Sequence, residues 1–452
     1  MNLLRNWRQD NILRRVVRNS SYLFVSYALG AVLTLVTARL LGAADFGILG
    51  TITVFSSNIN RLFSFRMGEM VVKYMGESLA HNDHVRAAAS VKAAMLVEAI
   101  TSLVAFGALA VLAPIGAAYV VHDATTAPLF LLYGVSILAN LINETSTGIL
   151  QVTNHYRSQA LINFLQTVLV AILLGMAAIH HSDLLTVLWI YLIGKMILGM
   201  GPALVAFYWL PRALGKDWWR APLSVLPPWR EVARFSISTN FNGTVNMIAR
   251  DNEVPIVSFF FGSAAAGYFK MALALINLIV TPINPFISTT YPEITRTIAS
   301  REWQKLRSLL QRVTLISTVW TGLVIVTLVA GHEILFERFT LFGRTIKLLV
   351  DYGPAYPALM ILMVGYGVAN IFFWNRPLLL AQGQAGFPFL VSLWGMIAKV
   401  ALMLLVLSRT NYLVEAVLLS AYLAGTVGIN VLYGLRRVNR EEGKAALQRQ
   451  TT

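Results

Sequence analysis

The sequence predicts an all-α integral membrane protein, with twelve transmembrane helices arranged as two parallel six-helix lobes around a central cavity. The first observation behind this prediction is composition, because 57% of the 452 residues are hydrophobic and only 13% are charged. A soluble domain typically carries about 25% charged residues. The charged residues of this chain are too few to cover the surface of a soluble domain of this length. The other two observations are the length of the apolar runs and an internal repeat.

The apolar residues gather in runs that are long enough to cross a bilayer. A helix needs about 20 predominantly apolar residues to span a hydrocarbon core of about 30 Å. The runs at 46–65 and 233–261 are the most polar of those that meet this requirement. The twelve runs are 20–41, 46–65, 88–112, 127–150, 158–180, 185–209, 233–261, 264–289, 308–331, 354–381, 385–408 and 412–433.

The basic residues predict how these helices are oriented. Most of the 36 lysines and arginines fall in alternate loops, on the side that also holds both termini. The loops of the opposite side contain only Arg338, Arg344, Lys347 and Arg409. Basic residues accumulate in cytoplasmic loops, so both termini are predicted to be cytoplasmic. The net charge of +15 is therefore a topology signal. No nucleic-acid partner is expected, because the charge forms no single basic patch.

A repeated glycine motif divides the chain into two halves. The sequence reads LLGAADFGIL at 40–49 and FFGSAAAGYF at 260–269, and each copy places two glycines five residues apart in a predicted hairpin between helices. Parallel lobes with a substrate site at the membrane midplane are a transporter architecture. The predicted organisation is an N-terminal lobe at 1–209, a basic cytoplasmic linker at 210–232, a C-terminal lobe at 233–435 and a cytoplasmic tail at 436–452.

Several of these residues carry a family resemblance. The Ala38-Arg39 pair that closes the first helix, the following LGAADFG, and Asp251 before FFGSAAAGYFKMA resemble the lipid-linked oligosaccharide (polysaccharide-repeat-unit) flippases of the multidrug/oligosaccharidyl-lipid/polysaccharide exporter superfamily. The resemblance runs through most of the chain in length, helix count and lobe arrangement. Its local motifs are short.

The resemblance implies a transporter without catalytic activity or cofactor. Such a protein is a proton- or sodium-linked alternating-access flippase in the bacterial inner membrane. It moves undecaprenyl-pyrophosphate-linked oligosaccharides to the periplasmic leaflet for surface polysaccharides such as O-antigen or exopolysaccharide. Its implied partners are membrane lipids, this lipid-linked substrate, a polysaccharide polymerase and glycosyltransferases.

Charged residues inside the predicted spans indicate where the substrate binds. An ionised side chain at the bilayer centre costs about 2.5–3.5 kcal/mol, so each must face a partner or a water-filled cavity. Bases outnumber acids within the spans, which predicts a mildly cationic cavity. Arginine binds pyrophosphate through paired hydrogen bonds. The predicted substrate-binding residues are Arg61, Lys195, Arg250, Arg376 and Lys399, with Phe373 and Trp374 as candidate glycan contacts and Asn242 and Asn246 on the polar stripe of the seventh span.

The carboxylates at bilayer depth are candidates for ion coupling. At 100° per residue, Arg250 and Glu253 share one stripe of the seventh span and can pair. Asp251 points elsewhere, so we expect it to need a partner from another helix or a cation. The fourth span presents Asn140, Asn143, Glu144, Thr147 and Gln151 on one face. The predicted ion-coupling residues are Asp251, Glu98 and Glu144. An alternative role for the Asn and Thr residues is hydrogen bonding that fixes helix packing. For Phe373 and Trp374, the alternative is packing of the rings against neighbouring helices or lipid.

The sequence gives little support for cysteine chemistry, ATP hydrolysis or metal binding. There are no cysteines, which excludes disulfides, iron–sulfur clusters and thiol catalysis. Gly215-Lys216 lacks the rest of a phosphate-binding loop, so we expect energy from an ion gradient, the membrane potential or the substrate gradient rather than from ATP. His180-His181 stands without further ligands, so no metal site is expected.

Two alternatives to a flippase remain. A small-molecule or multidrug exporter of the same superfamily would favour an acidic cavity for cationic drugs. A membrane polysaccharide polymerase or ligase would place catalytic residues in a large outer loop, and the outer loop of greatest length is 332–354. Within that loop, the mixed pattern at 333–352 predicts a short amphipathic helix at the membrane surface.

Overall fold

The computed structural model describes residues 11–63, 67–226, 244–245, 247–280, 283–341, 344–347, 349–384 and 386–451. Contacts divide the chain into two compact units. The first is the 35–267 unit. The second consists of residues 268–452 together with 1–34, and is called the 268–452 unit. The lobe boundaries predicted from the sequence stay a prediction.

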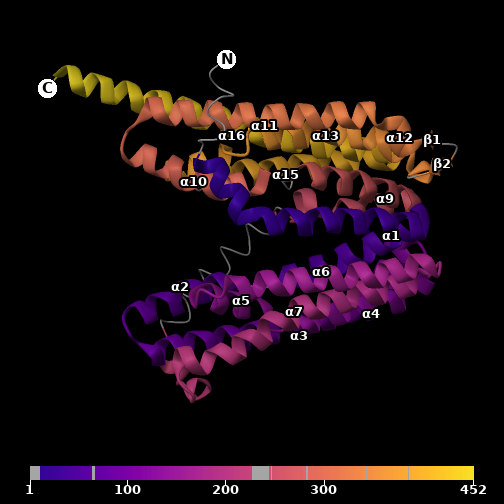
Figure 1. The fold of residues 1–452 in the computed structure, drawn as a ribbon, viewed down its shortest axis with the longest axis horizontal. Coiled ribbons are helices and arrows are strands. Elements are labelled where there is room, and N and C mark those ends of the chain that lie inside the picture. The colour runs from indigo at the N-terminus through magenta and orange to yellow at the C-terminus, as the bar shows by residue number, and fades with distance from the viewer. Residues whose placement is uncertain are drawn as a thin grey trace. The chain divides into compact units, whose positions relative to one another are not determined.

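Helices build the 35–267 unit. Helix α3 packs against α4, and both pack against α7, while α5 packs against α2 and α7 (Figure 1). Asp183 starts α7 by accepting a hydrogen bond from the backbone N–H of Thr186 at 3.0 Å, as an N-cap residue does. The helices are α1 (Asn11–Phe63), α2 (Met67–Ala80), α3 (His84–Ile115), α4 (Ala127–Ala139), α5 (Asn143–Val152), α6 (Tyr156–Ile179) and α7 (Leu184–Leu214), with a π-helical turn at Met247–Asp251.

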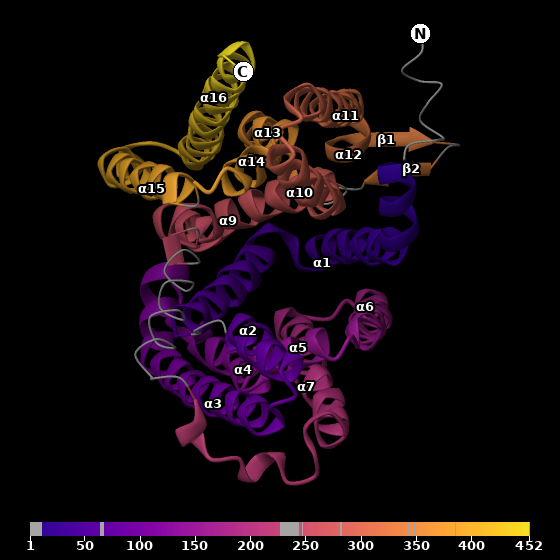
Figure 2. The same ribbon diagram turned by 90° about the vertical axis from the view of Figure 1, so that its left-hand side faces the viewer.

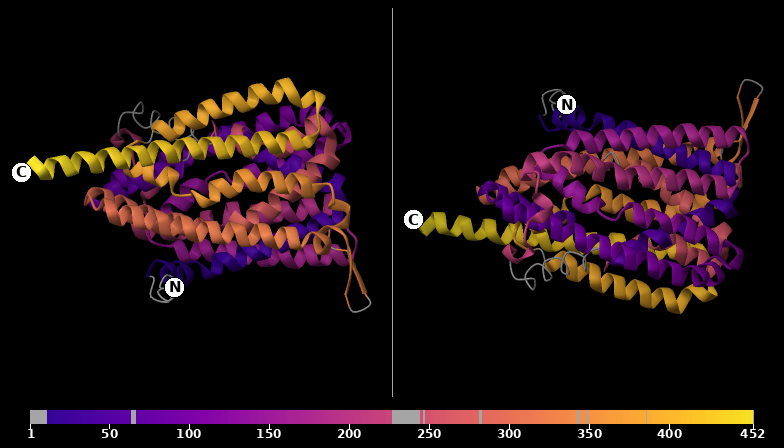
Figure 3. Two further views of the ribbon diagram at one scale, coloured as in Figure 1. Left: turned by 90° about the horizontal axis from the view of Figure 1, so that it is seen from above. Right: turned by 90° about the horizontal axis from the view of Figure 1, so that it is seen from below.

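The 268–452 unit is also helical. Helix α16 packs against both α13 and α15, and α10 packs against α14 (Figure 2). In both views of Figure 3 the C-terminal part of α16 extends beyond the other helices of its unit. The helices are α9 (Glu253–Val280), which begins in the other unit, α10 (Asn284–Ala299), α11 (Trp303–Ala330), α12 (His332–Phe336), α13 (Ala355–Ile371), α14 (Asn375–Ala381), α15 (Gly386–Val406) and α16 (Tyr412–Thr451).

The described residues contain ten helical segments that are long and apolar enough to cross a membrane. The chain is therefore a multi-pass, all-helical membrane protein, while the count of twelve helices stays a prediction. Two of the ten segments contain a kink, at Gly42 with φ of 71° and at Gly262 with φ of 83°. Glycine alone adopts such a backbone without strain. These are the first glycines of the repeated motif, where the sequence predicts hairpins.

The second glycines of the motif make a reciprocal contact. A Cβ atom added to Gly47 would lie 1.8 Å from the carbonyl oxygen of Ser263, and one added to Gly267 would lie 1.9 Å from that of Ala43. All four residues belong to the 35–267 unit. The eighth position of each motif thus rests on the fourth position of the other copy, at a distance that only glycine permits.

Two predicted spans are interrupted. The fourth breaks at residues 140–142, between α4 and α5, and the tenth breaks at 372–374, between α13 and α14. The prediction of one continuous polar face from Asn140 to Gln151 is therefore wrong, because Asn140 lies in the turn. The second segments begin with Asn143-Glu144 and Asn375-Arg376. Interrupted helices at corresponding positions of two halves commonly mark transporter binding sites.

The loop at 332–354, which the sequence predicts on the outer side, contains two paired β-strands. Strand β1 (Arg338–Leu341) pairs antiparallel with β2 (Arg344–Lys347), and Arg338 lies opposite Lys347. The predicted amphipathic helix over 333–352 is wrong, because only residues 333–336 of α12 and a 3₁₀ turn at Val350–Tyr352 are helical within this range. Strand β1 reads RFTL, which alternates polar and apolar residues as strands do, and the helical interpretation overlooked this pattern.

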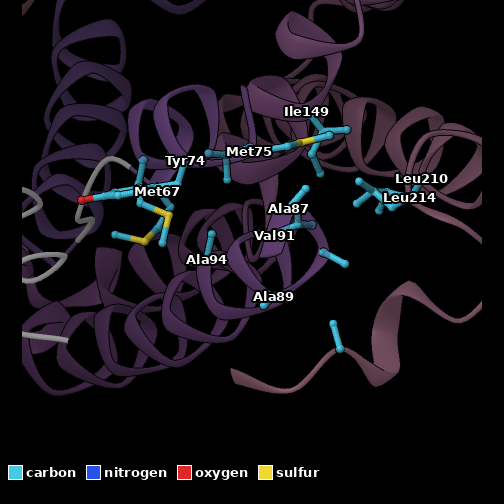
Figure 4. Packing of buried hydrophobic residues seen from close by; sticks show 14 of the residues in the cluster. Met67, Tyr74, Met75, Ala87, Ala89, Val91, Ala94, Ile149, Leu210 and Leu214 are labelled. Atoms are coloured by element: carbon cyan, nitrogen blue, oxygen red, sulfur yellow. The ribbon is translucent and has the colours of Figure 1, made fainter. Parts of the chain in front are cut away.

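An apolar core holds α2 against α3, α5 and α7. Met67, Tyr74 and Met75 of α2 belong to one cluster with Ile149 of α5 and Leu210 of α7, and Met75 lies beside Ile149 (Figure 4). Close glycine packing continues toward the start of α5. A Cβ atom on Gly68 would lie 2.8 Å from the Glu144 carbonyl oxygen, and one on Gly148 would lie 2.8 Å from the Gly68 carbonyl oxygen. The first turn of α5 is therefore fixed in position by its neighbours.

Candidate functional site

Asp251 lies between two guanidinium groups. Nη1 of Arg61, near the end of α1, is 2.6 Å from Oδ2 of Asp251, and Nε of Arg250 is 3.2 Å from Oδ1. The side chains of Arg61 and Arg250 are 47% and 50% exposed, and that of Asp251 is 32% exposed. Arg61, Arg250 and Asp251 are called the arginine–aspartate cluster. It carries two formal positive charges against one negative charge and is accessible from outside the protein.

The pairing of Arg250 corrects a prediction. We expected Arg250 to pair with Glu253 and to point away from Asp251. No ion pair joins Arg250 to Glu253 among the described residues, and the Glu253 side chain is buried. Residues 247–251 form a π-helical turn. Such a turn has more residues than an α-helical one, which reduces the angle between neighbouring side chains. The expected partner for Asp251 from another helix is present, as Arg61.

An amide pair lies next to this cluster. Nδ2 of Asn58 donates a hydrogen bond to Oδ1 of Asn252 at 2.8 Å. Asn58 lies about one helical turn before Arg61 in α1, and Asn252 directly follows Asp251. Sequence reasoning missed both residues. Asparagines within a predicted span are a usable signal, because polar side chains at bilayer depth need partners. The pair ties the second part of α1 to the segment that carries Asp251.

Glu98 forms the second group of interest. Its side chain is 5% exposed, and its carboxylate accepts hydrogen bonds from the backbone N–H groups of Glu144 at 2.7 Å and Thr145 at 2.8 Å. These are first-turn donors of α5, which have no partner within their own helix. The carboxylate of α3 therefore caps the helix that begins after the break, where the helix dipole favours a negative charge.

A polar cavity opens beside Glu98. Its volume is about 90 Å³, and every residue that lines it has an oxygen-bearing side chain. The break between α4 and α5 supplies part of this lining, because it directs two asparagines into the same space. The lining residues are Asn60, Glu98, Thr101, Ser102, Asn140, Asn143 and Glu144. We call this space the polar cavity; Glu98 and Glu144 were predicted as ion-coupling residues, whereas Asn60 was missed.

The remaining predicted cations differ in their surroundings. Lys195 of α7 and Arg376 of α14 are exposed. Lys399 of α15 is buried instead, and its Nζ lies 2.8 Å from Oε1 of Glu415, which is fully buried on α16. The charge of Lys399 is therefore balanced within the 268–452 unit.

The two candidate glycan contacts are buried. Phe373 is 7% exposed and Trp374 is 2% exposed, and both belong to an apolar cluster of the 268–452 unit. The indole N–H of Trp374 donates to Oγ1 of Thr314 at 2.8 Å. This is the packing role that the sequence left open as an alternative. Asn242 and Asn246 lie outside the described residues.

Solved structures of transporters share this fold. An inward-facing multidrug resistance MATE family transporter of the MOP superfamily aligns with a TM-score of 0.69 and 13% identity, over 92% of this chain and 95% of that one. The lipid II flippase MurJ, in an inward closed conformation, aligns with a TM-score of 0.67 and 14% identity, over 93% and 87%. A MOP superfamily transporter from Pyrococcus furiosus aligns with a TM-score of 0.64 and 13% identity, over 94% and 95%.

The sequence comparisons identify the family. No curated protein sequence matches the chain. A family model does match, over residues 12–298, and its family is described as polysaccharide biosynthesis protein. This match covers more than half of the chain and includes the arginine–aspartate cluster, the polar cavity and both copies of the glycine motif. The chain therefore belongs to the polysaccharide biosynthesis protein family and has the fold of MOP superfamily transporters.

Proposed function

We propose that this protein is a flippase that moves an undecaprenyl-pyrophosphate-linked oligosaccharide repeat unit from the cytoplasmic to the periplasmic leaflet for surface polysaccharide synthesis. The family and the transporter fold support this class of function. The protein would lie in the bacterial inner membrane with both termini in the cytoplasm, as the basic loops predict. It would act by alternating access of the predicted lobes at 1–209 and 233–435.

The arginine–aspartate cluster is the observation that carries this proposal. A pyrophosphate is an anion, and guanidinium groups bind phosphate oxygens through paired, charge-assisted hydrogen bonds. Arg61 and Arg250 are both about half exposed, and one aspartate cannot neutralise both. The cluster therefore keeps one positive charge and free donor capacity for the head group. Lys195 of the same unit would add to the positive field, and Asp251 would hold the two guanidinium groups in place when no substrate is bound. Arg376 of the 268–452 unit stays a predicted substrate contact.

A cationic-drug exporter is the second candidate, and the polar cavity is the observation that favours it. Its two carboxylates suit a cation, but its volume of about 90 Å³ is small. Drug-sized ligands occupy pockets of about 300–1,000 Å³. The cavity therefore suits an ion better than a drug, and Glu98 and Glu144 fit the coupling role that the sequence predicts. A polymerase or ligase has no supporting feature among the described residues of the outer loop.

The proposal is tested by deleting the gene in a host that has no redundant flippase. We expect lipid-linked repeat units to accumulate on the cytoplasmic leaflet and surface glycan to disappear, with both defects reversed by the wild-type gene. Normal surface glycan without accumulation would refute the proposal.

Complementation with variants tests the role of the cluster. A charge-assisted hydrogen bond contributes about 1.5–3 kcal/mol, so Arg61→Gln or Arg250→Gln should lower flipping by about tenfold or more. Arg61→Lys should be intermediate, because it keeps the charge but loses the paired geometry. Arg409→Gln, which changes an exposed arginine outside the cluster, is the matched control and should complement fully. Equal complementation by all four variants would show that the cluster does not bind the substrate.

A further inference from the structure

We propose that α16, near the end that the basic loops predict to be cytoplasmic, carries a binding site for an anionic phospholipid of that leaflet. Arg436 and Arg440 would hold the lipid phosphate, and Ile429 and Leu432 would contact its acyl chains. We call these four residues the α16 lipid stripe. All of them belong to the 268–452 unit, and lipid binding there does not depend on the proposed transport function.

The α16 lipid stripe lies on one face of the helix. At 100° per residue, its four positions fall within about 80° of one another. Ile429 and Leu432 are 50% and 59% exposed, and both arginines are exposed as well. The opposite face of α16 is packed into an apolar cluster of the same unit through Val431 and Val438. The stripe is therefore the side of α16 that the other helices of its unit leave uncovered.

The length of α16 places the two arginines at the level of lipid head groups. The candidate membrane span within α16 runs from Tyr412 to Gly443. A helix rises about 1.5 Å per residue, so about 20 residues cross a hydrocarbon core of about 30 Å. A span that begins at Tyr412 therefore leaves the core near Leu432, and Arg436 follows about 6 Å later. Arg440 is one turn farther, but side chains of a helix lean toward its N-terminus, which here means toward the bilayer.

No protein anion balances the two arginines. Among the described residues, neither Arg436 nor Arg440 forms an ion pair or a side-chain hydrogen bond. Glu442, which follows them on α16, is already paired with Arg307 of α11. A spacing of four residues places the Cβ atoms of the two arginines about 6 Å apart on the helix surface. Both guanidinium groups can therefore reach one phosphate, whose oxygens they bind through charge-assisted hydrogen bonds.

An anionic phospholipid fits this stripe better than other anions do. The arginines directly follow exposed apolar residues on the same face, so the site suits a ligand that has chains as well as a phosphate. No acidic residue occurs between positions 416 and 440. The ammonium group of a zwitterionic lipid would therefore find no carboxylate on this face. Clusters of basic residues directly after a membrane span are typical of sites for anionic lipids.

Native mass spectrometry of the purified full-length protein tests this inference. The first adduct of dioleoylphosphatidylglycerol should form at lower lipid concentration than that of dioleoylphosphatidylcholine. One basic residue at an anionic membrane surface strengthens binding by about fivefold, so Arg436→Gln/Arg440→Gln should weaken the phosphatidylglycerol adduct by about 30-fold. The matched control is Lys216→Gln/Arg301→Gln, which removes two exposed positive charges from other predicted cytoplasmic loops and should bind as the wild type does.

The melting temperature of each variant in lipid-free detergent shows whether it is folded, and the two single arginine variants replace the double variant if it is not. Equal wild-type affinity for the two lipids, or an unchanged adduct in folded Arg436→Gln/Arg440→Gln, would overturn the inference. An equal loss in the control would reduce the effect to net charge and overturn it too.

Competition separates the possible ligands of the stripe. Glycerol 3-phosphate, which carries the head-group phosphate without chains, should not displace phosphatidylglycerol even in large molar excess. Displacement by glycerol 3-phosphate would assign the arginines to a soluble anion, and displacement by polyglutamate would assign them to an acidic polypeptide. Either result would overturn the lipid as the ligand. Selective lipid binding in a protein that fails the gene-deletion test would uphold the stripe and reject the proposed cargo.

Discussion

Removing one partner of the buried Lys399–Glu415 pair is expected to destabilise the protein strongly. The two charges lie 2.8 Å apart. At an effective dielectric constant of about 20, their attraction is worth about 6 kcal/mol at this distance. Burial costs several kcal/mol for each ion, so the intact pair contributes little net stability. Glu415→Gln removes the attraction but leaves the ammonium group buried. We therefore expect the free energy of unfolding to fall by about 3–5 kcal/mol.

Unfolding by SDS in mixed micelles measures this change. The double variant Lys399→Met/Glu415→Leu removes both charges and should recover most of the lost stability, because no buried ion then loses its oppositely charged partner. The same double variant separates a packing role from the predicted substrate role of Lys399. Retained flipping would assign Lys399 to packing, and lost flipping in a stable double variant would assign it to the substrate. A single variant as stable as wild type would refute the reasoning about the buried pair.

Three further predictions concern packing and stability. Gly47→Ala should prevent stable folding, because the added Cβ would lie 1.8 Å from a backbone oxygen. The control Gly175→Ala should fold, because its added Cβ meets nothing within 4 Å. Fluorescence-detected size-exclusion chromatography compares the two variants. Thr314→Val should cost about 1–3 kcal/mol in SDS unfolding, since it leaves the indole N–H of Trp374 buried without its acceptor. At pH values above about 4, which is the pKa of aspartate in an unfolded chain, Asp183→Ala should lower the melting temperature. Hydrogen bonds from the first turn of α7 hold the pKa of Asp183 below its ordinary value, so its contribution is lost as pH falls through that lowered pKa. A melting difference between wild type and this variant that does not shrink as the pH falls below about 4 would contradict the capping role.

Part of the fold could be predicted because membranes impose simple rules. Apolar runs of sufficient length mark spans, and the ten described segments fall where such runs were found. The backbone turns at Gly42 and Gly262 could also be predicted, because the repeated motif places a glycine at each and the positive φ angles require it.

The breaks within the fourth and tenth spans could not be predicted in this way. A turn of three residues at 140–142 hardly changes the hydropathy of its surroundings, and its stabilisation comes from Glu98, which is remote in sequence. The polar residues of the fourth predicted span, 127–150, indicate a site, but they do not indicate an interrupted helix. Tertiary hydrogen bonding decides the backbone here.

The candidate site was predicted only in outline. Charges at bilayer depth identified Arg61, Arg250, Asp251 and Glu98, since each is costly in lipid. The same argument included Lys399, whose partner Glu415 lies on another helix and could not be assigned by periodicity. The pairing of Arg250 with Asp251 was missed because it depends on a π-helical turn, which leaves no mark in the hydrophobic pattern.

The reciprocal contact between Gly47 and Ser263, and between Gly267 and Ala43, is the contact that a two-fold homodimer of half-length chains would make. In such a dimer one surface meets its own copy, so a single motif supplies both sides of the interface. The fold thus holds inside one polypeptide the kind of contact that otherwise joins two copies of a chain. Related chains in which the two motifs vary together would support this mutual dependence, and chains in which they vary independently would argue against it.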